Sequence, residues 1–140
     1  MKTHMSFATK DLDASVAFYH TLLGVEPAKQ YKDYALFLID DPGLELALSR
    51  DADAPAAGGA HYGIAVDSAD FVRNMIRRLS QAGLPVDIEL DETCCYAVQD
   101  KVWATDPDGR RWETYHVVAE ANERDGSTET CCTSGATNCC

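Results

Sequence analysis

The feature that most constrains the fold of this chain is an internal repeat. One order of predicted elements, βαβββ, occurs twice in the 140 residues, on either side of a short Ala-, Pro- and Gly-rich stretch. Period-two alternation of apolar and polar residues indicates the strands, and apolar residues at helical spacing indicate the helices. Such a repeat predicts two similar modules that share one core. We therefore expect an α+β protein in which two curved sheets, with helices packed outside, form a cup.

The repeat also sets the expected boundaries. The first module spans residues 1–50, a linker spans 51–59, and the second module spans 60–118. Residues 119–140 are polar and nearly free of large apolar side chains, so they cannot offset their ordering entropy and are expected to form a flexible, cysteine-bearing tail. The small linker lets the two modules close one cup within a chain or exchange between the chains of a homodimer.

Capping residues mark the ends of the two expected helices. The first helix should begin after Asp11 and end at Gly24, and the second should begin after Ser68 and end at Gly83. The expected strands are 1–9, 25–31, 34–40, 44–50, 60–66, 85–90, 96–105 and 110–117.

Charge and hydropathy exclude several classes of function. The net charge of −11 argues against binding to nucleic acid or anionic membranes. No apolar run is long enough to cross a membrane and no secretory signal opens the chain, so a cytoplasmic protein is expected. Six cysteines without a signal peptide favour thiol or metal chemistry over a disulfide framework.

Equivalent strands of the two repeats carry histidine and glutamate. His4 and His61 lie on the first strand of each repeat, and Glu45 and Glu113 lie on the last. Any one of these residues alone is best interpreted as a solvated strand residue, but the matched placement of all four favours a metal site. Two imidazoles and one carboxylate suit non-haem Fe(II) and O2. Adding Glu45 would favour octahedral Ni, Zn, Mn or Co.

Cys94 and Cys95 form a second constellation. A disulfide between neighbouring residues would strain the peptide between them. As thiolates, however, the two can bind one soft, thiophilic centre of a substrate or metal. A pair packed as small apolar residues, or a regulatory disulfide, are the alternatives.

Other cysteines and histidines lie outside this pattern. The tail carries Cys131, Cys132, Cys139 and Cys140. These accessory thiols either capture a soft ion and pass it inward or have no catalytic part, and both interpretations stay open. His20 is expected on a helix surface, and His116 is expected outside the site.

Two stretches carry a resemblance to a known family. "DLDASVAFYHTLLGVEPAK" and "TDPDGRRWETY" resemble the vicinal oxygen chelate superfamily of glyoxalases and extradiol dioxygenases, over roughly residues 1–118. "TCCYAVQDKVW" followed by "TDPDGRRWETYHV", together with the tail cysteines, resembles more narrowly the ArsI/CadI group of arsenic-resistance C–As lyases and cadmium-induced proteins.

The resemblance implies a concrete activity. Members of the group are described as Fe(II)- and O2-dependent enzymes that split the carbon–arsenic bond of trivalent organoarsenicals, giving arsenite and an oxidised organic fragment. It implies that His4, His61 and Glu113 bind Fe(II). It also implies that Cys94 and Cys95 hold the arsenic through two As–S bonds.

Two other functions compete with this one. A non-enzymatic protein could sequester Cd(II) or As(III) through Cys94, Cys95 and the tail, with no need for iron. A glyoxalase-type lyase or isomerase would use Ni or Zn with Glu45 as a ligand, since Glu45 corresponds to the fourth ligand of glyoxalase I-like relatives. Ni, Zn or Co can also replace Fe(II) in a purified sample.

Overall fold

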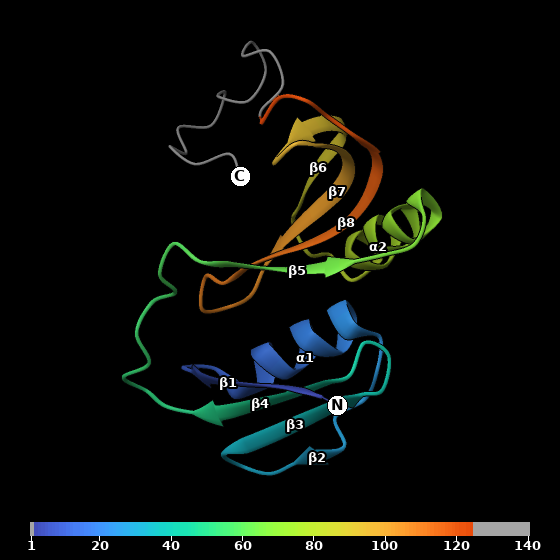
Figure 1. Ribbon diagram of the computed structural model, residues 1–140. Helices are drawn as coiled ribbons and strands as arrows, with labels where there is room; N and C mark the ends of the chain where they lie inside the picture. Colours follow the sequence, from blue (N-terminus) through green and yellow to red (C-terminus); the bar gives the residue numbers. More distant parts are fainter. Residues whose placement is uncertain (1, 125–140) are drawn as a thin grey trace.

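The computed structural model describes residues 2–124, and this part of the chain forms an α+β fold (Figure 1). The elements of the first module are β1 (Thr3–Thr9), α1 (Leu12–Leu23), β2 (Lys29–Gln30), β3 (Tyr34–Ile39) and β4 (Leu44–Arg50). The elements of the second module are β5 (His61–Ala65), α2 (Ala69–Gln81), β6 (Val86–Cys94), β7 (Ala97–Thr105) and β8 (Arg111–Glu120). The predicted order βαβββ is present twice.

The repeat extends to the topology of the sheets. Their strand orders are β1-β4-β3-β2 and β5-β8-β7-β6. In each sheet the first strand of the module pairs in parallel with the last, and the other neighbours are antiparallel. The strands expected to carry histidine and glutamate are therefore direct neighbours in both modules. The expected α+β class with two βαβββ modules is confirmed.

Three strand boundaries differ from the prediction by more than two residues. The expected strand 25–31 is reduced to the two residues of β2, because Pro27 lacks the N–H that a ladder needs. Strand β6 continues past Leu90 to Cys94 through a register shift between Glu89 and Glu92. Strand β8 runs to Glu120 and so includes the first two residues of the expected tail.

Most of the predicted capping residues act as expected. The Asp11 side chain accepts a hydrogen bond of 3.0 Å from the Ala14 amide, and Gly24 ends α1 with a φ of 71°. Ser68 stands at the N-cap of α2, although its side chain makes no capping hydrogen bond. Gly83, with a φ of 73°, follows the end of α2. Glycine adopts such left-handed conformations without steric cost.

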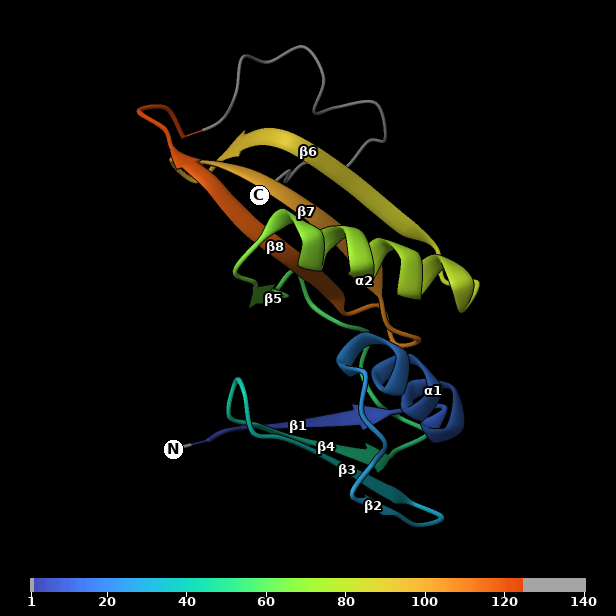
Figure 2. The same ribbon diagram turned by 90° about the vertical axis from the view of Figure 1, so that its right-hand side faces the viewer.

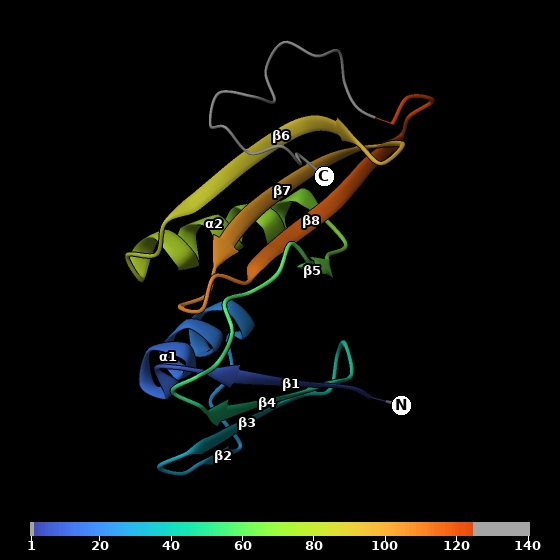
Figure 3. The same cartoon turned by 90° about the vertical axis from the view of Figure 1, so that its left-hand side faces the viewer.

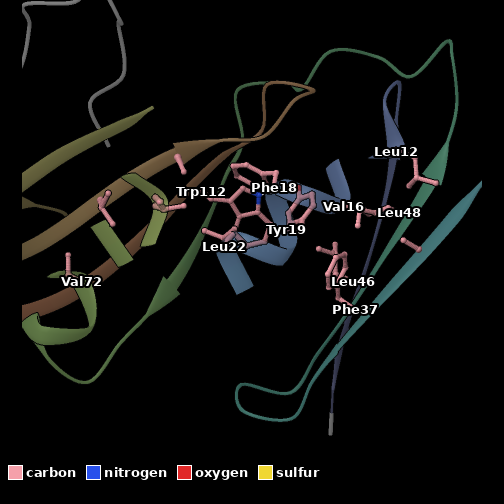
Figure 4. Close-up of a cluster of buried hydrophobic side chains, with 14 residues drawn as sticks. Leu12, Val16, Phe18, Tyr19, Leu22, Phe37, Leu46, Leu48, Val72 and Trp112 are labelled. Atoms are coloured by element: carbon pink, nitrogen blue, oxygen red, sulfur yellow. Dashed lines mark hydrogen bonds between the residues drawn. The ribbon is translucent and has the colours of Figure 1, made fainter. Parts of the chain in front are cut away.

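One hydrophobic core joins the two modules (Figure 4). Helix α1 lies between the first sheet and the second module, as Figures 2 and 3 show from opposite sides. The Tyr19 ring meets the Trp112 ring edge-on at 5.8 Å, and the Phe7 and Tyr62 rings lie 5.2 Å apart. The surfaces buried between the modules are thus the helix-bearing faces of the two sheets.

Each of the four candidate metal ligands lies on the face of its sheet that is opposite to the helix-bearing face. Successive side chains of a strand point to opposite faces. The neighbours of the four candidates that belong to or pack against the core are Met5, Leu46, Tyr62 and Trp112. Both histidine–glutamate faces therefore turn away from the core that the modules share.

A buried polar network also connects the modules. Asp106, in the turn before β8, accepts hydrogen bonds from the Tyr19 hydroxyl at 2.7 Å and from Arg110 Nη1 at 2.9 Å. Trp112 Nε1 donates to the Tyr19 hydroxyl, and Arg110 Nη2 donates to the Ala8 carbonyl. Burial and the adjacent Asp106 raise the pKa of Tyr19. The "TDPDG" turn, which carries no chemistry by its sequence alone, thus fixes the second module against α1 and β1.

The structure bears on the expected absence of a membrane span, and it does not reach the tail cysteines. Among residues 2–124, no helix is long and apolar enough to cross a membrane. The accessory cysteines, Cys131, Cys132, Cys139 and Cys140, lie outside the described residues.

Candidate functional site

Each sheet carries one histidine–glutamate pair on neighbouring parallel strands. His4 Nδ1 lies 3.7 Å from Glu45 Oε2, across β1 and β4. His61 Nε2 lies 3.6 Å from Glu113 Oε1, across β5 and β8. The Glu113 side chain is 14% exposed, whereas that of Glu45 is 42% exposed. The sequence repeat therefore places equivalent ligand types at equivalent positions, with the better-buried carboxylate in the second module.

The donor atoms of both pairs fit a divalent metal ion. Two ligands at right angles on a six-coordinate ion, with bonds of ~2.1 Å, lie roughly 3 Å apart. The observed 3.6 and 3.7 Å are close enough that small side-chain rotations would place both donors of a pair on one ion. Imidazole nitrogen with carboxylate oxygen suits Fe(II) and also Ni, Zn or Co. Each pair supplies only two ligands, so a complete site needs a further contribution.

One chain does not bring the four side chains together. The described residues contain no group of three or more His, Cys, Asp or Glu side chains placed to hold one metal ion. Of the two arrangements that the linker allows, one cup within a chain or exchange between chains, the first is not seen among these residues. The physical reason is the packing of the modules, because their helix-bearing faces meet and their histidine–glutamate faces point apart.

Trp103 forms one wall of the second pair. It lies directly across from Glu113 on β7 and is 4% exposed. Its ring meets the His61 ring edge-on, with centroids 5.3 Å apart and an interplanar angle of 80°. The Arg111 guanidinium lies 4.1 Å from the Trp103 ring. The second pair is thus bounded by an aromatic side chain that is itself held in place.

Burial and nearby charges shift the pKa of Glu113 in opposite directions. Lys101, two residues before Trp103, is 1% exposed, and its Nζ lies 3.6 Å from Glu89 Oε2. Burial raises the pKa of Glu113 above its ordinary value, and the charges of Lys101 and His61 reduce this effect without cancelling it. The carboxylate is therefore a group whose ionised form is poorly solvated until a cation binds it.

This environment predicts a pH-dependent effect of Glu113→Gln on the metal-free protein. A folded-state pKa above the unfolded-state value means that ionisation destabilises the fold. This cost is absent below the unfolded-state pKa and is complete above the folded-state pKa. Glu113→Gln should therefore raise the free energy of unfolding at about pH 7 and lose this advantage at about pH 4. Urea unfolding with a chelator present measures both, and an equal difference at the two pH values would contradict it.

Cys94 and Cys95 lie at a two-residue hairpin turn between β6 and β7. Cys94 pairs with Ala97, and the intervening Cys95 and Tyr96 have φ angles of 56° and 66°, as a type I′ turn requires. The left-handed backbone of Cys95 brings its sulfur within 3.3 Å of the Cys94 sulfur. Cys94 is buried and disulfide-bonded, whereas Cys95 is exposed and free. Once Cys94 is reduced, both sulfurs are placed to bind one soft centre.

The thiols share a sheet face with Glu113 but lie far along it. On β7, Ala97 and Trp103 point to the same face, and they pair with Cys94 and Glu113 respectively. Ala97 also pairs with Glu120, seven residues beyond Glu113 on β8. At ~3.3 Å per residue, this separation is roughly 20 Å. The thiols are therefore not beside the metal pair in this conformation.

The remaining histidines are held by backbone carbonyls. His20 Nδ1 lies 3.1 Å from the Val25 carbonyl oxygen, and His116 Nδ1 lies 3.1 Å from that of Val66. Neither belongs to the two pairs, as expected.

Sequence reasoning missed three residues that surround the second pair. These are Gly63, Lys101 and Trp103, which lie on the same face of the sheet as Glu113. A signal was present, because Lys101 and Trp103 have the strand parity that faces Glu113. Alternation along this strand indicates its secondary structure but does not show which residues surround Glu113.

Two βαβββ modules, each with a histidine–glutamate pair across parallel strands, are the features on which the chain can be compared with known proteins. The chain matches the Glyoxalase/Bleomycin resistance protein/Dioxygenase superfamily over residues 3–114 and belongs to that family. A solved glyoxalase/bleomycin resistance protein/dioxygenase from Alicyclobacillus acidocaldarius has the same fold, with a TM-score of 0.66 and 21% identity over 84% of this chain and 92% of that one.

Relatives of higher identity narrow the group. The cadmium-induced protein CadI of Mycobacterium tuberculosis (strain ATCC 25618 / H37Rv) is 39% identical over 143 residues, covering 94% of this chain and 92% of the relative. The trivalent organoarsenical cleaving enzyme of Thermomonospora curvata is 40% identical over 133 residues, covering 94% of this chain and 88% of the relative. The resemblance to a group that contains both kinds of protein is confirmed.

Proposed function

We propose that the protein cleaves the carbon–arsenic bond of trivalent organoarsenicals, methyl or aromatic, with Fe(II) and O2, and so serves arsenic resistance by releasing arsenite. The observation that carries this proposal is the pair of sulfur atoms 3.3 Å apart, at Cys94 and Cys95, on the same sheet face as a histidine–glutamate pair. Trivalent arsenic is a soft centre, and two adjacent thiolates suit it. The similarity to a trivalent organoarsenical cleaving enzyme supports the same substrate.

In this proposal three side chains hold the metal ion. His61 and Glu113 come from one chain and His4 from a second chain, with Glu45 beside His4 as the candidate fourth ligand. Bound Fe(II) would supply the binding and activation of O2 at positions that the protein leaves open. The protein fixes the ion at one end of the sheet face and excludes water from the Glu113 side of it.

The geometry of the two pairs supports a homodimer. Within one chain the two pairs lie on faces that turn away from a shared core, so they cannot reach one ion without disrupting that core. A second copy can present its His4 face to the His61 face of the first. A two-fold arrangement of this kind would build two equivalent sites.

The thiols hold the arsenic so that its carbon substituent remains free. Two As–S bonds to Cys94 and Cys95 require the reduced pair, so turnover needs a thiol reductant. Register shifts interrupt the pairing of β6 with β7 and of β7 with β8 close to the hairpin, between Glu89 and Glu92 and between Val98 and Gln99. Bulges bend strands locally. We propose that the strands bend at these two positions, which would bring the arsenical bound at the hairpin toward the metal.

Electron counting supports O2 as the only oxidant required. Converting the methyl group of methylarsenite to formaldehyde removes four electrons, and arsenic stays trivalent. One O2 accepts four electrons, and its two oxygen atoms enter arsenite and formaldehyde. The overall reaction, methylarsenite plus O2 to arsenite plus formaldehyde, balances without another reductant. Holding the substrate by thiolates near the metal lowers the entropic cost of bringing the reactants together.

The thiol role predicts the effect of Cys95→Ser. One As–S bond is lost, and because the second bond forms intramolecularly, arsenical affinity should fall by at least about 100-fold. Anaerobic titration with methylarsenite measures the affinity, and arsenite release in air measures turnover. Ser80→Ala is the control, because it changes an exposed side chain on α2, away from the turn. Unchanged turnover in Cys95→Ser would refute the clamp.

A second candidate function is sequestration of Cd(II) or As(III) by the thiols alone. The similarity to a cadmium-induced protein favours it. It requires no histidine–glutamate site, so His4→Ala should leave cadmium and arsenical resistance of the host cell unchanged. Loss of arsenical resistance in that variant would exclude it.

A third candidate is a glyoxalase-type reaction with Ni or Zn and Glu45 as a ligand. The 3.7 Å separation of His4 and Glu45 favours it. It gives no role to the adjacent thiols. Failure to turn over methylglyoxal–thiol adducts with Ni or Zn would remove this candidate.

A further inference from the structure

Glu113 lies between two cross-strand neighbours of unusual size. On one side, Gly63 of β5 pairs with Glu113, and on the other side Trp103 of β7 does so. Glycine is the smallest residue and tryptophan the largest. We propose that Gly63 and Trp103 are positioning residues that form a slot, open at the glycine and closed at the tryptophan, which fixes the Glu113 carboxylate beside His61 for metal binding.

The glycine provides space and serves no backbone requirement. Gly63 is not among the residues with positive φ, so any residue could adopt its conformation. A Cβ added there would meet Glu113 Oε1 at 3.0 Å, the Tyr115 ring at 3.1 Å and Glu113 Cγ at 3.3 Å. Glycine within a strand costs roughly 0.5–1 kcal/mol relative to alanine. This cost is offset if the Glu113 side chain must occupy the space above β5.

The tryptophan closes the slot and orients the imidazole. Its ring contacts the His61 ring edge-on at 5.3 Å, and Arg111 lies 4.1 Å from its ring. The Trp103 Nε1–H is buried and has no hydrogen-bond partner in the part of the chain that the structure describes. A buried donor without a partner is costly, and phenylalanine would avoid that cost. The size of the indole, which reaches both His61 and Arg111, is therefore the property that this position uses.

Together the two residues restrict the donor atoms of the pair. The His61 Nε2 to Glu113 Oε1 separation is 3.6 Å, near the spacing that one ion imposes. A shift of a few tenths of an ångström in the carboxylate changes that spacing. Residues that orient metal ligands affect metal affinity by about 10–100-fold when they are replaced.

The inference rests on the metal site of the proposed function, and the test uses metal binding alone. Metal-free protein is titrated with Co(II) by calorimetry, comparing wild type, Gly63→Ala and Glu113→Gln. Gly58→Ala is the matched control, because a Cβ there has no neighbour within 4 Å. We expect Gly63→Ala to weaken Co(II) binding by at least about 10-fold. Gly58→Ala should bind like wild type.

A second variant separates positioning from a merely structural role. Trp103→Leu removes the contact with the His61 ring and should also weaken Co(II) binding by at least about 10-fold. The urea midpoint of each metal-free protein reports on structure independently. A loss of affinity without a matching loss of midpoint supports the slot.

Three results would overturn the inference. If Gly63→Ala and Trp103→Leu bind Co(II) like wild type while Glu113→Gln does not, the metal site stands and the slot is wrong. If loss of affinity in these variants only follows loss of the urea midpoint, the slot is also wrong. If wild-type protein binds no Co(II), the metal site fails together with the inference.

Discussion

Glu113→Gln is expected to abolish arsenite release from methylarsenite and to weaken Co(II) binding by at least about 100-fold. Glutamine keeps the shape of the side chain but removes the charge that a divalent cation needs. Glu113 is the best candidate for a large effect, because its carboxylate is 14% exposed and lies 3.6 Å from His61. Arsenite release in air and calorimetric titration measure the two effects. Glu120→Gln, on the same strand but exposed, is the matched control.

The same variant tests whether the site is shared between chains. His4→Ala and Glu113→Gln should each be inactive, because every site then lacks one ligand. In a mixed dimer one site contains both substitutions and the other contains neither. The two variants are co-expressed, each with its own tag. Half of the randomly formed dimers are then mixed, and each mixed dimer has one intact site of two. Roughly a quarter of wild-type activity should therefore be restored. A mixture that stays inactive would place all ligands in one chain.

The second large effect concerns stability. Asp106→Ala should lower the free energy of unfolding by about 3–5 kcal/mol, because removing one partner of a buried ion pair leaves the other uncompensated. Asp106 is 3% exposed, and Arg110, which donates to it at 2.9 Å, is 8% exposed. The Tyr19 hydroxyl loses its acceptor as well. Urea unfolding of the metal-free protein measures the change.

Asp70→Ala provides the comparison for this stability effect. Asp70 also makes an ion pair, with Arg73 at 2.8 Å, but its side chain is 81% exposed. Exposed pairs contribute about 0–1 kcal/mol. Equal losses for the two aspartates would show that Asp106 does not connect the modules in the way that its contacts indicate.

The sequence predicted the two modules because their signals are local. The strand parity of His4 and Glu45, and of His61 and Glu113, follows from alternation and from the repeat, and the parallel pairing of the strands that carry them places each pair side by side. The caps at Asp11 and Gly24 likewise depend on neighbouring residues only. Such features need no knowledge of how distant segments pack.

What the sequence could not provide depends on long-range packing. Nothing near His4 indicates that Tyr19 packs against Trp112, which turns the two histidine–glutamate faces apart. The sulfur separation of Cys94 and Cys95 depends on a left-handed residue in a turn that alternation alone cannot anticipate. The burial of Lys101 and the polar contacts of Asp106 are also set by side chains far away in the sequence.

The stoichiometry of arsenite release decides whether the protein is an Fe(II)- and O2-dependent C–As lyase. Metal-free protein is reconstituted anaerobically with Fe(II), supplied with methylarsenite and a thiol reductant, and then exposed to a known amount of O2. Arsenite, formaldehyde and consumed O2 are quantified together. We expect equal amounts of all three, and no arsenite when either iron or O2 is omitted. Tight binding of methylarsenite without arsenite release, or release in the absence of O2, would contradict it.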